Sequence, residues 1–129
     1  MMKISRKVAV RIGVLSLLAG AVATPAIAHH SFAMFDQKKI SEKASATVSE
    51  FRFTNPHSFV VVNVRESGKT VRYVFECSSV NMMSKAGWKH NTLKAGDRVD
   101  VTFSPLRNGK PGGMLKEIKL ADGRVLSGW

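Results

Sequence analysis

Two adjacent histidines, His29 and His30, follow the triplet Ala26-Ile27-Ala28, which is typical of sites where exported chains are cleaved. Cleavage after Ala28 would give His29 a free amine beside its imidazole, so that one residue offers a metal two nitrogens. A second imidazole would complete a T-shaped or tetragonal set of nitrogens, the geometry that Cu(II) prefers. The pattern therefore predicts a copper site of the histidine-brace type.

The third nitrogen is predicted to come from His57, which lies in the segment Asn55-Pro56-His57-Ser58. A proline fixes the backbone before it, and a rigid turn holds a ligand better than a flexible loop does. His30 is the substitute third ligand, and His90 in a loop is a further candidate. The alternatives are a solvated, mobile end for His29 and a turn residue bonded to neighbouring backbone for His57.

Sulfur atoms offer softer ligands. Four methionines follow residue 28, namely Met34, Met82, Met83 and Met114, and thioethers suit Cu(I), although core filling is their commoner use. Met82 and Met83 are neighbours and cannot face the same side of a helix, so at most one is expected in the core. Cys77 is expected to be a small buried hydrophobe, with a soft metal ligand as the alternative.

The sequence gives little support for nucleotide binding, hydrolase chemistry or a structural zinc site. The chain has no glycine-rich nucleotide loop, no G-x-S-x-G elbow and no zinc-finger spacing, and its carboxylates at Asp36, Glu50 and Glu76 are isolated. No catalytic residue is assigned, and an enzyme is not expected. Two classes of function remain. One is a binding or accessory module for a periplasmic protein or small ligand, which the sequence favours; the other is a Cu(II) carrier using His29 and His57.

The first 28 residues have the three parts of a secretory signal peptide. A basic start containing Lys3 and Arg6 is followed by an apolar run, Ile12 to Ala23, which is shorter than the ~20 residues that span a membrane. We therefore expect a signal peptide at 1–28, a single domain at 29–129, a periplasmic location, and no transmembrane segment after cleavage.

The composition is strongly basic, with 20 Lys and Arg against 9 Asp and Glu. The signal peptide carries four of these basic residues and no acid, so the remaining chain stays basic. Nucleic acid is not expected as a partner of an exported chain, and the basic residues form no dense run. The charge is assigned to solubility and to weak contact with anionic lipid or cell-wall surfaces.

Alternating apolar residues predict a chain of strands with one helix. The expected strands are Ile40 to Phe53 with a bulge near Ser49-Glu50, Ser58 to Arg65, Thr70 to Cys77, Arg98 to Ser104, Met114 to Leu120, and a short strand after the turn at 121–124. A short helix near Ser79 to Ala86, ended by Gly87, follows the third strand.

This order predicts an all-β fold with one short helix, a small five- or six-stranded OB-like barrel. A generic small barrel or a sandwich is the alternative. Closure suits a short chain because it removes exposed strand edges. The predicted core comprises Val48, Phe51, Val60, Val62, Val71, Tyr73, Phe75, Val99, Val101 and Leu115.

Several short motifs occur together along the chain: His29-His30-Ser31-Phe32, Asn55-Pro56-His57, Ala86-Gly87-Trp88, Leu93 to Asp97 and Leu120 to Arg124. With these motifs the chain resembles a family of small exported bacterial proteins known as a domain of unknown function. The resemblance implies export and a single domain. It implies no activity, substrate or cofactor.

Overall fold

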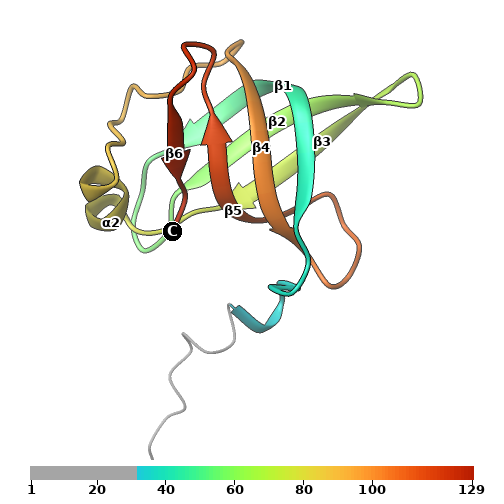
Figure 1. Cartoon of the computed structure of the whole chain (residues 1–129), viewed down its shortest axis with the longest axis horizontal. Helices are drawn as coiled ribbons and strands as arrows, with labels where there is room; N and C mark the ends of the chain where they lie inside the picture. The colour runs from blue at the N-terminus through green and yellow to red at the C-terminus, as the bar shows by residue number, and fades with distance from the viewer. Residues whose placement is uncertain (1–31) are drawn as a thin grey trace, which may run out of the picture.

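The computed structural model describes residues 32–129, which form six strands and a short helix (Figure 1). The elements are β1 (Ser41–Arg52), β2 (Phe59–Glu66), β3 (Lys69–Glu76), α2 (Val80–Lys85), β4 (Arg98–Pro105), β5 (Gly112–Lys119) and β6 (Val125–Ser127). The predicted strands and helix are all present in the predicted order. Because residues 1–31 are not described, the predicted signal peptide lies outside this part of the chain.

The strands form one sheet in the order β3-β2-β1-β4-β5-β6, and a parallel pairing of β3 with β5 closes the first five into a barrel. The helix lies between the third and fourth strands of this barrel. That topology is the OB-like arrangement, so the predicted fold is confirmed. β6 adds a sixth strand outside the barrel by pairing with β5.

Two glycines allow β5 to approach its neighbours at the closure. A Cβ atom at Gly112 would collide with the carbonyl oxygen of Val74 in β3, and one at Gly113 would collide with that of Ser104 in β4. The strand therefore begins at Gly112, two residues before the predicted start at Met114. The sequence suggested a loop because glycine is rare in strands, except where another backbone approaches closely.

β1 bends twice in order to pair with β2 on one side and β4 on the other. Its register against β2 shifts between Val48 and Glu50, which confirms the predicted bulge. A second shift, against β4, lies between Lys43 and Ala46. There Ser45 has a φ of 53°, and its amide donates to Oδ1 of Asp100 at 2.8 Å.

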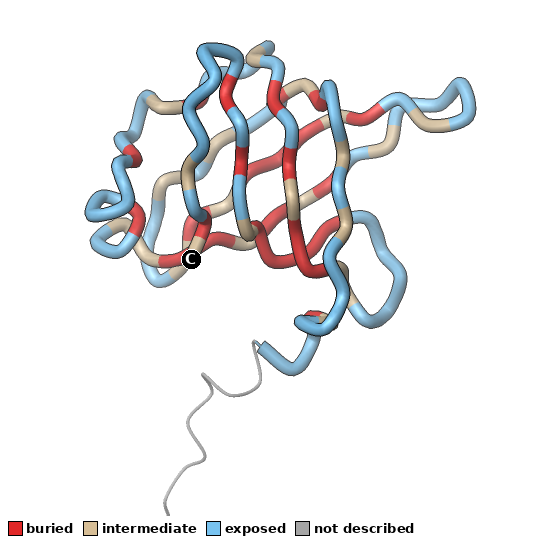
Figure 2. Tube along the Cα trace, in the orientation of Figure 1, coloured by how far each residue is buried: buried red, intermediate tan, exposed pale blue. Residues whose placement is uncertain are grey.

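The core fills the barrel; buried residues alternate with exposed ones in the first half of β4, whereas the first four residues of β5 are all buried (Figure 2). Eight of the ten predicted core residues are buried; Phe51 and Val71 are partly buried and pack against the others. Trp88, after α2, closes one end of the core with 2% of its surface exposed. Its Nε1 donates to the carbonyl oxygen of Ser127 at 2.8 Å, which joins the segment after α2 to the end of β6.

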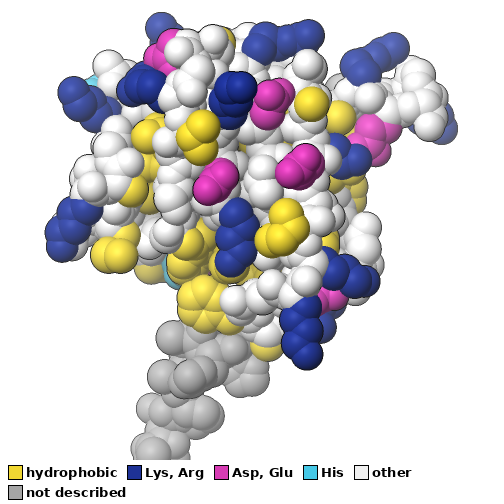
Figure 3. All heavy atoms as spheres, viewed as in Figure 1, with side chains coloured by type: hydrophobic (Ala, Val, Ile, Leu, Met, Phe, Trp, Pro, Cys, Tyr) yellow, Lys and Arg dark blue, Asp and Glu magenta, His cyan; other side chains and the backbone are white. Residues whose placement is uncertain are grey.

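Lys and Arg side chains are spread over the surface with carboxylates between them, as the face in Figure 3 shows. Several of these charges are paired, as in the contact of Arg124 with Asp122 at 2.8 Å. The described part of the chain contains no helix that is long and apolar enough to cross a membrane.

Candidate functional site

His57 lies in a turn that its neighbours hold closed. The amide of Thr54 donates to Oγ of Ser58, and Oγ1 of Thr54 donates to the carbonyl oxygen of His57 at 2.8 Å. Oδ1 of Asn55 accepts from the amide of Val80, which ties the turn to the start of α2. The backbone at His57 is therefore fixed, as the proline before it suggested.

The imidazole of His57 is partly buried between Glu76 at the end of β3 and the ring of Trp129. Nδ1 lies 2.8 Å from Oε1 of Glu76, although the ring N–H is not directed at this oxygen and makes no aligned hydrogen bond. The rings of His57 and Trp129 have centroids 5.4 Å apart. A carboxylate at Nδ1 leaves Nε2 as the nitrogen that is available to a ligand.

Burial dominates the electrostatics of this pair. The side chain of Glu76 is 17% exposed, and burial raises the pKa of its carboxyl group, while a positive charge on His57 would lower it. A positive charge in contact with a partly buried carboxylate favours the charged form of that carboxylate. Glu76 is thus suited to hold the ring and to compensate a cation bound there.

An aromatic contact links this site to the beginning of the described chain. Phe32 packs edge-on against Trp129 with centroids 5.1 Å apart, and Nε1 of Trp129 donates to the carbonyl oxygen of Glu76 at 3.1 Å. The residues after Phe32 are anchored to the β4–β5 loop, because Arg107 donates from Nε to the carbonyl oxygen of Ala33 and from its amide to that of Met34. Phe32, Trp129 and His57 therefore form one aromatic cluster.

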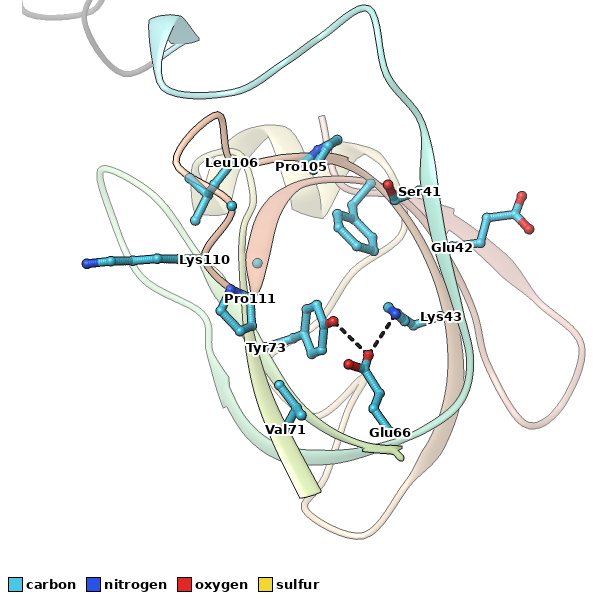
Figure 4. A pocket seen from close by; sticks show the side chains of 13 residues that line it. Ser41, Glu42, Lys43, Glu66, Val71, Tyr73, Pro105, Leu106, Lys110 and Pro111 are labelled. Atoms are coloured by element: carbon cyan, nitrogen blue, oxygen red, sulfur yellow. Dashed lines mark hydrogen bonds and ion pairs between the residues drawn. The ribbon is translucent and has the colours of Figure 1, made fainter. Parts of the chain in front are cut away.

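A second feature is a cavity of about 490 Å³ at one mouth of the barrel, between β1, β3 and the β4–β5 loop (Figure 4). At one end, Oε1 of Glu66 accepts from the hydroxyl of Tyr73 and from Nζ of Lys43, both at 2.7 Å. At the other end lie apolar side chains, including Phe103, Leu106 and Pro111. His57 does not line this cavity.

The charges in this cavity reinforce one another. The hydrogen bond from Lys43 lowers the pKa of Glu66, and the same bond raises the pKa of Lys43. Burial raises the pKa of the Tyr73 hydroxyl. At neutral pH the cavity therefore contains an ammonium, a carboxylate and a neutral phenol.

The family model described as "Family of unknown function (DUF6152)" matches residues 17–116. The chain belongs to this family. The match confirms the resemblance to a domain of unknown function, and it includes His57 and Glu76 but not Trp129. Neither the curated proteins nor the solved structures contain a match to the chain.

In this DUF6152 protein the predicted metal ligands fall partly outside the described residues. His29 and His30 precede them, His57 lies in the site above, and His90 is exposed in the loop after α2. Between residues 32 and 129, no three His, Cys, Asp or Glu side chains come together as a metal would require. A metal at His57 would thus need ligands from the preceding segment.

The sulfur-containing residues include both buried and exposed side chains, as the sequence predicted. Met83 is buried and Met82 is exposed, which confirms that at most one of them lies in the core, and Met114 is buried as well. Met34 is exposed beside a small hollow that Glu76 also lines. Cys77 is fully buried, as predicted, and burial raises the pKa of its thiol well above the usual range.

Sequence reasoning missed several residues of both features. Glu76 appeared as an isolated carboxylate, and Trp129 lies 72 positions beyond His57, so no local pattern joins them. Lys43, Glu66 and Tyr73 come from three different strands. One usable signal was position: Glu76 follows Phe75 in an alternating strand, which places its side chain on the outer face of the barrel, the face on which the turn at His57 lies.

Proposed function

We propose that this protein is an exported, periplasmic binding module whose ligand is a single Cu(II) ion. The ion is held by the amine and ring of His29 and by Nε2 of His57, with His30 as the substitute third ligand. The protein acts as a carrier, and no catalytic residue is assigned to it.

The observation that carries this proposal is the aromatic cluster. Phe32 contacts Trp129, and Trp129 contacts His57, at centroid distances of 5.1 and 5.4 Å. His29 precedes Phe32 by three residues, a length of chain that reaches about 10 Å. A chain beginning at His29 can therefore reach the exposed side of the His57 ring, which supports a shared metal.

The arrangement around His57 suits a metal ligand. Histidines that bind metals commonly have a carboxylate at their other ring nitrogen, which sets the tautomer and the ring orientation. Glu76 stands at that position, 2.8 Å from Nδ1. Three nitrogens with no obligatory carboxylate ligand favour copper over calcium or magnesium, and copper binds most tightly among the divalent first-row metals.

Copper titration of correctly processed protein tests the proposal. The starting protein begins at His29, and it is compared with a form whose N-terminal amine is acetylated and with His57→Ala. Blocking the amine should weaken Cu(II) binding by at least about a hundredfold, and losing His57 by at least about tenfold, because each change removes a nitrogen ligand. His90→Ala is the matched control, since His90 is exposed and lies in a different loop. Equal affinity in all four proteins would disprove the site.

Three further measurements separate the parts of this proposal. Binding needs an unprotonated amine and neutral imidazoles, so affinity should fall as the pH is lowered. Glu76→Gln should weaken binding by about tenfold or more, as is usual when the partner of a ligating histidine is lost. An intact mass that begins at a residue other than His29 would refute export with cleavage after Ala28, and with it the brace.

A further inference from the structure

The barrel-mouth cavity has hydrogen-bonding capacity that its own residues do not use. The ammonium of Lys43 has three N–H groups, and its contact with Glu66 at 2.7 Å engages one of them. Glu66 receives both the Lys43 and the Tyr73 hydrogen bonds on the same oxygen, Oε1. Lys43 is 31% exposed, so a ligand can approach its remaining donors.

Two charged groups of the chain face into the cavity, Lys43 and Glu66. The carboxylate of Glu42 and the ammonium of Lys110 are both directed away from it, as Figure 4 shows. The unused N–H groups of Lys43 are therefore the charged donors that a ligand would meet, and they favour a ligand with one anionic group.

Most of the remaining lining is apolar. Phe103 and Tyr73 contact each other edge-on, with centroids 6.1 Å apart, and they form one wall of the cavity. Pro105 at the end of β4, and Leu106 and Pro111 from the β4–β5 connection, also line the cavity. Aromatic and proline surfaces suit a planar apolar body, and a volume of about 490 Å³ is within the range of small-molecule sites.

We propose that the barrel mouth binds a small organic monoanion with a planar apolar body. Its carboxylate or sulfonate accepts from Lys43, while its apolar body lies between the Tyr73–Phe103 wall and the β4–β5 loop. The residues involved differ from those of the proposed copper site, so either proposal can fail without the other.

The test uses two fluorescent probes that differ in one group. 8-Anilinonaphthalene-1-sulfonate has a planar apolar body and one negative charge, and N-phenyl-1-naphthylamine has the same ring system without the charge. We expect the sulfonate to bind the wild-type protein about tenfold more tightly, the effect of a charge-assisted hydrogen bond. Amide chemical shifts should move at Val71 and Gly112, which line the cavity.

Two variants with opposite expected effects identify the charges. Lys43→Met keeps much of the apolar stem and removes the ammonium, and it should weaken sulfonate binding about tenfold without changing binding of the neutral probe. Glu66→Gln keeps an acceptor for Tyr73 and removes the competing negative charge, so it should tighten sulfonate binding about threefold. If Lys43→Met fails to fold, the expected increase in sulfonate affinity of the Glu66→Gln variant still tests the proposal.

Lys89→Met is the matched control, because Lys89 is an exposed lysine in the loop after α2 and does not line the cavity. It should leave the affinity of both probes unchanged. Equal binding of the two probes to the wild-type protein would overturn the proposal. So would weaker sulfonate binding by Glu66→Gln, an equal effect of the Lys43 and Lys89 substitutions, or chemical-shift changes confined to residues outside the cavity.

Discussion

Replacing Gly113 with alanine should open the barrel at its closure. Gly113 pairs with Phe75 of β3 and Pro105 of β4, and its added Cβ would collide with the carbonyl oxygen of Ser104 and lie 2.9 Å from the Phe103 ring. The obstacle is backbone, so β5 must move away from one neighbour. Losing about three strand hydrogen bonds, each worth about 1 kcal/mol, lowers the free energy of unfolding by about 3 kcal/mol.

Gly109→Ala provides the comparison, because it separates steric overlap from backbone conformation. Gly109 has a φ of 75°, and a Cβ added there would meet no heavy atom within 4 Å. Alanine at this position should therefore lower the free energy of unfolding by about 1 kcal/mol, because a side chain disfavours the left-handed backbone conformation. Urea unfolding followed by circular dichroism measures both variants, and Gly113→Ala should also lower the Tm by about 15 °C. This account of the closure would be refuted if Gly113→Ala lowered the free energy of unfolding no more than Gly109→Ala does.

Three further results are expected. Lys43 lowers the pKa of Glu66, so the Glu66 carboxylate stabilises the folded protein at pH values above its ordinary pKa of 4.5, and this stability is lost as the pH falls further. Urea unfolding at neutral and at acidic pH should therefore show Glu66→Gln to be less stable than wild type only at neutral pH. Trp88→Phe removes the donor to the Ser127 carbonyl oxygen and should cost about 2 kcal/mol in the same assay, whereas an unchanged midpoint would show that this hydrogen bond contributes little. Cys77 should not react with a thiol reagent such as dithionitrobenzoate in the folded protein and should react fully in urea, because its thiol is buried and burial raises its pKa; rapid labelling of the folded protein would contradict this.

The fold could be predicted because its signals are local. A β-branched run in residues 58–65 and alternation in residues 70–77 mark two strands, and Ser67-Gly68 between them supplies two positive φ angles, 49° and 78°, for a tight hairpin turn. Ser79 caps α2 by accepting from the amide of Met82, as its type suggested. Each of these features depends on residues within a few positions of one another.

The contacts of the candidate sites could not be predicted in this way, because they join residues far apart in the chain. The contact of Glu76 with His57 depends on where β3 ends relative to a turn that precedes β2. The Lys43–Glu66–Tyr73 group requires the register of β1, β2 and β3 to be known to one residue. Gly112 and Gly113 suggested a loop, although the close approach of three strands requires them there.

The parallel pairing of β3 with β5 also affects the order in which the protein can fold. Phe75 and Gly113 are distant in sequence, as are Ala46 and Val99 of the β1–β4 pair, whereas the β2–β3 hairpin is local. Folding slows when native contacts join distant residues, since the loop between them must be closed first. A growing chain can form the hairpin early, yet β3 keeps an open edge until residues 112–119 have emerged. Until then the hairpin edge stays available for pairing with another chain, so the interval before β5 arrives is the period of greatest exposure to aggregation.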